Sequence, residues 1–98
     1  MANNGTAFIE EIYGQTYQLG LVETQDQFSQ KICGKSPRWY SVVVSNSREP
    51  SVSSLWNMAA NLNKIGSAER SRNTKRVILE LHDKVMAKLQ DKTIHYEV

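Results

Sequence analysis

The stretch ETQDQFSQKICGKSPRWYSVVV, residues 23–44, contains two short helical patterns that a tight turn separates. Thr24 precedes Gln27 by three residues, which is the spacing of a capping box at the start of a helix. We therefore expect a helix over about 25–32, ended by Gly34. Its inward-facing side chains, one helical turn apart, are Phe28 and Ile32.

A second short helix is predicted directly after the turn, over residues 37–45. Ser36 is a candidate N-cap, and Pro37 suits the first helical position, where a backbone N–H has no partner in any case. Tyr40 and Val43 lie three residues apart and form the inward pair. A chain that needed only a core would use one longer helix, so the break between the two helices points to a use for the outer face of the second.

Helices are also predicted on both sides of this stretch. Upstream, an apolar pattern of helical period runs over about 6–19, and Gly20 ends it. Downstream, Ser51 or Ser53 caps a further helix, which Gly66 ends. The core-facing residues of this helix are Val52, Leu55, Met58, Ala59 and Leu62, with a partly buried Trp56 at the edge.

An apolar stripe at helical spacing marks the C-terminal segment and consists of Ile78, Leu81, Val85 and Leu89. The stripe either folds back onto the preceding helices or pairs with the same helix of a second chain. We favour dimerisation and assign these four residues to it. We predict an all-α chain with one domain over 1–66 and a helical extension over 67–98.

Two segments flank the stripe. The polar segment SAERSRNTKR, residues 67–76, either begins the last helix or links to it, and it is either a phosphate-gripping arm or a solvated segment. The final TIHYEV, residues 93–98, alternates apolar and polar side chains, which predicts a short terminal strand or an extended arm.

Basic residues are concentrated in the middle of the chain. The net charge is only +2, but nine basic residues and two acidic ones lie between Phe28 and Arg76, and no Lys or Arg precedes Phe28. Such a distribution suits a surface that faces a polyanion, although a solvated face explains the charge equally well.

Composition also bounds the class of protein. A content of 40% hydrophobic and 22% charged residues is typical of an ordinary soluble globular protein. No apolar run approaches the ~20 residues that cross a bilayer. The N-terminal residues have neither the basic region nor the apolar region of a signal peptide. We therefore expect a cytoplasmic protein without a membrane partner.

The residue types needed for catalysis or metal binding are not grouped in this sequence. Cys33 is the single cysteine, so the chain can form no internal disulfide and no Cys-based metal cluster, and we expect Cys33 to be inert. His82 and His95 are far apart and no other ligand-type residues cluster with them. No nucleophile with a base and no Gly-rich phosphate loop appears. We predict neither an enzyme nor a cofactor.

From Thr6 to Leu62 the sequence resembles the helix-turn-helix core of the lambda-repressor/Cro-like (XRE) DNA-binding family. The matching positions are Thr24, Gln25, Phe28, Ser29, Ile32, Gly34, Ser36, Tyr40, Val43, Pro50, Ser51, Leu55 and Ala59. The resemblance implies a lambda-repressor-like domain of four to five short helices plus a C-terminal helix. It also implies a bacterial, phage or mobile-element transcriptional regulator that binds double-stranded DNA as a homodimer. One extra residue, Cys33, precedes Gly34, so we expect a longer turn than is usual in the family.

With Tyr40 and Val43 inward, the outer face of the second helix is free to enter a major groove about 12 Å wide. Arg38 can hydrogen-bond guanine O6 and N7, and Val42 can touch a thymine methyl group. The residues expected to read bases are Arg38, Trp39, Ser41, Val42 and Ser45. The resemblance implies a phosphate contact for Gln25, and the residues expected to bind phosphate are Gln25, Lys35, Ser36 and Arg48.

An alternative from another functional class stays open. Trp39, Val42 and Val44 are apolar for a groove-facing helix, and Trp39 is as well suited to packing as to base stacking. The fold can equally serve as a protein-interaction module, such as an anti-activator or adaptor that binds a second regulatory protein.

Overall fold

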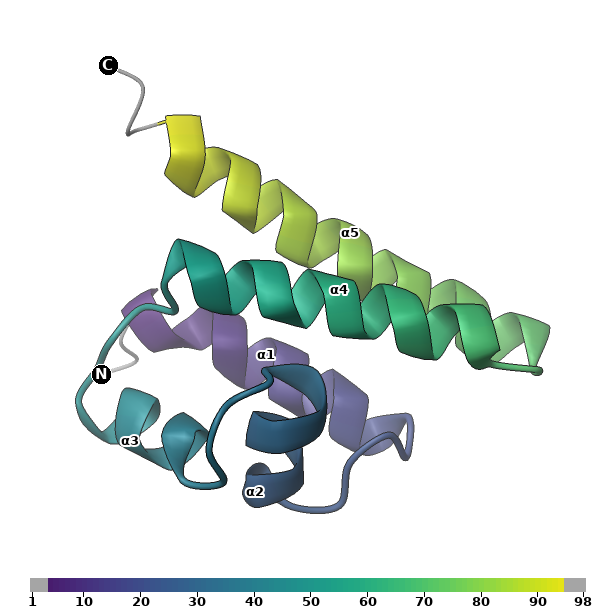
Figure 1. The fold of residues 1–98 in the computed structure, drawn as a ribbon, viewed down its shortest axis with the longest axis horizontal. Coiled ribbons are helices and arrows are strands. Elements are labelled where there is room, and N and C mark those ends of the chain that lie inside the picture. The colour runs from purple at the N-terminus through teal and green to yellow at the C-terminus, as the bar shows by residue number, and fades with distance from the viewer. Residues whose placement is uncertain (1–3, 95–98) are drawn as a thin grey trace. The chain divides into compact units, whose positions relative to one another are not determined.

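A computed structural model describes residues 4–94, and within this range every regular element is a helix. The elements are α1 (Asn4–Gln18), α2 (Gln25–Gln27), the π-helical turn η1 (Phe28–Ile32), α3 (Trp39–Ser45), α4 (Val52–Ala68) and α5 (Arg72–Ile94) (Figure 1). The all-α prediction is therefore confirmed for the part of the chain that is described.

The chain divides into two compact units, an N-terminal unit (Met1–Pro50) and a C-terminal unit (Ser51–Val98). This division differs from the boundary expected at residue 66. The reason is that α4, which we had grouped with the upstream helices, makes its main packing contacts with α5.

Helix α1 ends where Gly20 was expected to stop it. Gly20 has a φ of +78°, in the left-handed region that favours glycine. Its N–H donates to the Tyr17 carbonyl, and the N–H of Leu21 donates to the Thr16 carbonyl, each at 3.0 Å. These two bonds form a Schellman motif, which satisfies the last carbonyls of the helix.

The next helical segment begins with the predicted cap. Thr24 Oγ1 accepts the Gln27 N–H at 3.1 Å, and Gln27 Oε1 accepts the N–H of Glu23 at 2.8 Å. The reciprocal half of the capping box thus reaches one residue further back than the standard pattern. The bounds expected for this helix, 25–32, match the combined span of α2 and η1.

Within this segment, Cys33 is accommodated differently from our expectation of a longer turn. The N–H of Cys33 donates to the carbonyl of Phe28, five residues back, at 3.1 Å. The wider turn of η1 therefore takes up the extra residue inside the helix. Gly34 follows with a φ of +65°, and the N–H of Lys35 donates to the Ser29 carbonyl at 2.9 Å.

Helix α3 starts two residues later than predicted. Ser36 does not begin the helix: its carbonyl accepts the N–H of Trp39 at 3.0 Å, and Arg38 has φ −91° and ψ 1°. These values describe a type I turn with Pro37 at its second position. The fixed φ of proline suits this turn as well as it suits a first helical position, so the sequence signal was real but its element was misassigned.

The predicted end of this helix at residue 45 is confirmed, since α3 ends at Ser45. The N–H of Arg48 donates to the Val43 carbonyl at 2.9 Å, and that of Ser47 to the Val44 carbonyl at 3.1 Å. This is a second Schellman motif, in which Ser47 takes the left-handed position with a φ of +53°.

The core of the N-terminal unit is built on a triangle of aromatic rings. Tyr13 from α1, Phe28 from η1 and Tyr40 from α3 have ring centroids 5.0–5.3 Å apart in each pair. The side chains of Ile32 and Val43 are also buried. All four inward positions predicted for the two short helices, 28, 32, 40 and 43, are therefore confirmed.

The C-terminal unit is an antiparallel hairpin of α4 and α5 (Figure 1). Ser51 caps α4, because its Oγ accepts the Ser54 N–H at 3.1 Å. Gly66 does not end α4, which continues to Ala68. Instead, a Cβ at this position would lie 3.0 Å from Leu79 Cδ2 and 3.2 Å from Ile78 Cγ2, so Gly66 permits a close approach of the two helices.

Three further expectations for this unit differ from the structure. The residues assigned to dimerisation, Ile78, Leu81, Val85 and Leu89, are buried within the single chain. Trp56 is 55% exposed rather than partly buried at the core edge. The terminal strand or extended arm expected over 93–98 does not begin at residue 93, because α5 continues to Ile94, and residues 95–98 lie outside the described residues.

Candidate nucleic-acid interface

The outer face of α3 is formed by Arg38, Ser41, Val42 and Ser45, which fall within one side of the helix at 100° per residue. Arg38 and Ser45 are exposed, Val42 is 48% exposed and Ser41 is half-buried. The structure therefore places four of the five predicted base-reading residues on one surface. It is opposite the buried pair Tyr40 and Val43.

Trp39, the fifth base-reading candidate, lies at the flank of this face. Its side chain is half-buried, as is that of Val44 on the other flank. Trp39 therefore packs along one edge while keeping part of its ring accessible, which is intermediate between the packing and stacking roles that the sequence left open.

A buried hydroxyl positions α3 against the preceding helix. The backbone N–H of Tyr40 donates to Ser29 Oγ at 2.9 Å, and the Ser29 hydroxyl donates to the Gln25 carbonyl at 3.1 Å. Ser29 is fully buried. Because α3 has no side-chain cap of its own, Ser29 satisfies one of its first N–H groups from another helix.

The hydroxyl of Ser41 is already engaged within α3. It donates to the Arg38 carbonyl at 3.1 Å. A serine hydroxyl has one proton and two lone pairs, so Ser41 can still accept a hydrogen bond from a base or an amino group. Its chemistry at this face is that of an acceptor.

The four predicted phosphate-binding residues lie around α3. Gln25 is exposed at the first position of α2, Ser36 is exposed in the turn, and Arg48 is exposed directly after α3. Lys35 is half-buried next to Gly34. All four belong to the N-terminal unit, on segments adjoining the one that carries the outer face.

The charge of this region has one sign. Residues 27–48 contain no Asp or Glu and four basic residues, Lys31, Lys35, Arg38 and Arg48. Lys31 is exposed on η1, and we had assigned it no role. The absence of acidic residues from 27–48 is the sequence signal that could have added Lys31 to the predicted phosphate-binding residues.

Burial shifts the pKa values of two titratable groups in the N-terminal unit. Burial raises the pKa of Tyr40 to about 12, with smaller contributions from Glu10, Tyr13 and Cys33. Burial also raises the pKa of the Cys33 thiol, partly opposed by Lys35. Only a thiolate is a good nucleophile, so the environment of Cys33 suits a packing role.

Residues 4–94 contain no group of three or more His, Cys, Asp or Glu side chains placed to share a metal ion. No helix in that range combines the length and apolarity that crossing a bilayer requires.

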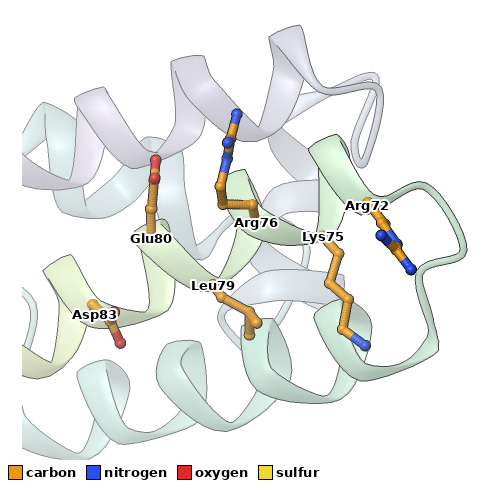
Figure 2. Close-up of a pocket in the computed structure, with 6 residues that line it drawn as sticks. All are labelled: Arg72, Lys75, Arg76, Leu79, Glu80 and Asp83. Carbon is orange, nitrogen blue, oxygen red and sulfur yellow. The ribbon is translucent and has the colours of Figure 1, made fainter.

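A hollow of about 380 Å³ lies on α5, in the C-terminal unit (Figure 2). Its lining residues are Arg72, Lys75, Arg76, Leu79, Glu80 and Asp83. The three cations come from the segment 67–76, for which the sequence alone admits either a linker or the start of the last helix, and either a phosphate-gripping arm or a solvated segment. The structure resolves its form: 69–71 link the helices, and α5 begins at Arg72.

The chain belongs to a family of unknown function, DUF6626, whose sequence model matches residues 9–97. No curated protein and no solved structure matches the chain. The family carries no described activity, so the helix-turn-helix interpretation depends on the residues and their geometry.

Proposed function

We propose that the N-terminal unit binds duplex DNA as a helix-turn-helix, with α3 in the major groove, and that the protein is a sequence-specific transcriptional regulator. The observation that carries this proposal is the outer face of α3. It is presented by a helix fixed through Ser29 and the aromatic triangle, inside a segment that contains basic residues and no acidic ones.

The dimensions of α3 suit a groove. An α-helix with its side chains is about 10–12 Å across, and the major groove is about 12 Å wide. Arg38 at the start of α3 is exposed and has the fork of donors that matches guanine O6 and N7. Val42 presents a branched apolar group for a thymine methyl, while Ser41 and Ser45 supply smaller polar contacts.

The surrounding residues would hold the helix in register. Lys31, Lys35 and Arg48 supply charge for phosphate contacts, and the exposed side chains of Gln25 and Ser36 supply hydrogen bonds. Contacts of this kind orient the protein on the duplex and contribute affinity that does not depend on sequence.

A homodimer is part of the proposal. A single short helix reads only a few base pairs, and dimers bind half-sites about 34 Å apart. The stripe Ile78–Leu89 is buried within the chain, so the proposal places dimer contacts on another surface.

Two matched variants test the assigned roles. Arg38→Ala should remove discrimination at one base position, worth about 1–3 kcal/mol, and leave binding to random duplexes nearly unchanged. Lys35→Ala should weaken binding to selected and random duplexes by the same factor. Competition binding with single-base variants of a selected duplex measures both effects. Equal losses for the two variants on all duplexes would contradict these roles.

A second candidate function is favoured by the 48% exposure of Val42 beside the half-buried Trp39. An exposed apolar side chain next to another apolar side chain suits a protein partner as well as a base methyl group. In this alternative the protein is an interaction module that binds another regulator. Val42→Lys discriminates the two, because added charge preserves non-specific DNA affinity but would abolish an apolar protein contact.

A further inference from the structure

The tip of the C-terminal hairpin carries a concentration of positive charge. We define the hairpin tip as residues 69–76, which include the α4–α5 link and the first turn of α5. Its four cations are Arg70, Arg72, Lys75 and Arg76, and its one carboxylate is Glu69. That carboxylate is already used locally, because Glu69 Oε2 accepts the N–H of Ser71 at 3.0 Å.

Among residues 4–94, none of the four cations forms an ion pair with a carboxylate. Arg70, Arg72 and Arg76 are exposed, and Lys75 is half-buried. Three of them also lie in the first turns of a 23-residue helix, where the helix dipole disfavours positive charge. The arrangement therefore costs stability in the isolated chain.

The directions of the side chains indicate the shape of a partner. In Figure 2, the side chain of Arg76 points to one side of α5, and the side chains of Arg72 and Lys75 point to the other side. All three line the one hollow, and side chains that spread along it suit successive charges of an extended polyanion better than one small anion. Glu80 and Asp83 line the far end of the hollow, so an anionic partner would be confined to the tip.

We propose that the hairpin tip is a second phosphate-contacting surface, which holds the backbone of duplex DNA without reading its sequence. Duplex DNA presents one negative charge per about 1.7 Å of axis, which suits several cations spaced along a helix. The identity of the polyanion rests on the proposed function of the N-terminal unit, whereas the presence of the basic surface does not.

A charge-matched pair of triple variants of the full chain tests the proposal. The tip triple is Arg72→Gln, Lys75→Gln and Arg76→Gln. The control triple is Lys64→Gln, Lys84→Gln and Lys88→Gln, which removes the same charge from the same unit and also combines two exposed side chains with one half-buried one. Binding to selected and random duplexes is titrated by anisotropy over a range of salt concentrations, beside Arg38→Ala.

The tip triple should weaken binding to selected and random duplexes equally, tenfold or more near 0.1 M salt. The slope of log K against log salt should become shallower by about 2–3, since each lost phosphate contact removes about 0.9. The control triple should leave the slope nearly unchanged. Equal effects of both triples, or no effect of the tip triple, would overturn the proposal.

The thermal midpoint separates binding from a structural role. Removing cations from the start of α5 should leave the midpoint unchanged or raise it. A lower midpoint with an unchanged salt slope would assign the tip to folding and overturn the proposal.

The two proposals fail in different ways. Loss of sequence preference in Arg38→Ala together with unchanged binding of the tip triple would support the proposal for α3 and contradict the proposal for the hairpin tip. Weakened binding of the tip triple together with unchanged sequence preference in Arg38→Ala would support the proposal for the hairpin tip and contradict the proposal for α3. Absence of duplex binding by the unmodified chain would overturn both.

Discussion

The backbone N–H of Tyr40 donates a 2.9 Å hydrogen bond to the buried hydroxyl of Ser29, eleven residues earlier in the chain. This bond joins η1 to α3 and lies under the outer face of α3. The position of that face therefore depends on a single serine in the preceding helix, as well as on the packing of Phe28 and Tyr40.

Ser29→Ala should lower the free energy of unfolding by about 1–3 kcal/mol, because the buried N–H of Tyr40 loses its partner. Ser41→Ala is the matched control. The Ser41 hydroxyl also bonds to a carbonyl, but within its own helix and at a half-buried site, so a change within about 0.5 kcal/mol is expected. Urea unfolding followed by circular dichroism measures both. Similar losses for the two variants would contradict the role given to Ser29.

Ser47→Gly should raise the free energy of unfolding by about 0.5 kcal/mol. Ser47 has a φ of +53°, a conformation that costs an L-residue roughly 1–2 kcal/mol and that glycine adopts freely, although glycine loses more backbone entropy on folding. The same substitution two residues earlier, Ser45→Gly, lies inside α3 and should lower stability by about 0.5–1 kcal/mol. Changes of the same sign in thermal unfolding would be inconsistent with the Schellman motif at the end of α3.

Gly66→Ala and Gly14→Ala should have opposite effects, although both glycines lie inside helices. A Cβ at position 14 meets no atom within 4 Å, so alanine should add about 1 kcal/mol through its helix propensity. A Cβ at position 66 meets Leu79 at 3.0 Å and Ile78 at 3.2 Å. Overpacking there should exceed the propensity gain and lower stability by about 1 kcal/mol. A gain in thermal stability at both positions would argue against the close approach of α4 and α5.

The shifted pKa of Tyr40 predicts a loss of stability in alkaline solution. Burial disfavours the charged phenolate and raises the pKa of Tyr40 from 10.0 to about 12. Because the pKa is higher in the folded state, the contribution of the neutral Tyr40 side chain to the free energy of unfolding is complete below pH 10. This contribution is lost as the pH rises towards 12. The free energy of unfolding falls by about 2 kcal/mol over this range of pH. Urea midpoints at pH 9 and pH 11.5 should therefore differ more for the natural chain than for Tyr40→Phe, and equal differences would refute the assignment.

Local signals in the sequence were sufficient for much of the fold. The cap at Thr24, the stop at Gly20 and the inward residues of the two short helices follow from patterns within a few residues. These features depend on the backbone and on one face of one helix, which is the information that a short window of sequence contains.

Other features depend on contacts between segments, and they were missed for that reason. Gly66 carries the same signal whether it ends a helix or admits a neighbouring one, and only the position of Leu79 distinguishes the two. The extra residue Cys33 could lengthen a turn or widen a helix, and the bond to Phe28 shows the second outcome. Pro37 fits a type I turn as well as a helix start.

Part of the candidate site could also be predicted from the sequence, and part of it could not. The outer face of α3 followed from the inward pair Tyr40 and Val43, because exposure on a helix is the complement of burial. The engagement of the Ser41 hydroxyl by the Arg38 carbonyl was not foreseen, since a rotamer decides it. The stripe Ile78–Leu89 showed an apolar face but not which helix covers it.

The most direct test of the central claim is a fluorescence-anisotropy titration of the full chain against pooled short duplexes, with the salt concentration varied from low to physiological. A DNA-reading α3 predicts tight binding, a steep negative dependence on salt and enrichment of a short palindromic sequence from the pool. Weak binding that selects no sequence would contradict the claim and would assign the exposed Val42 face to a protein partner.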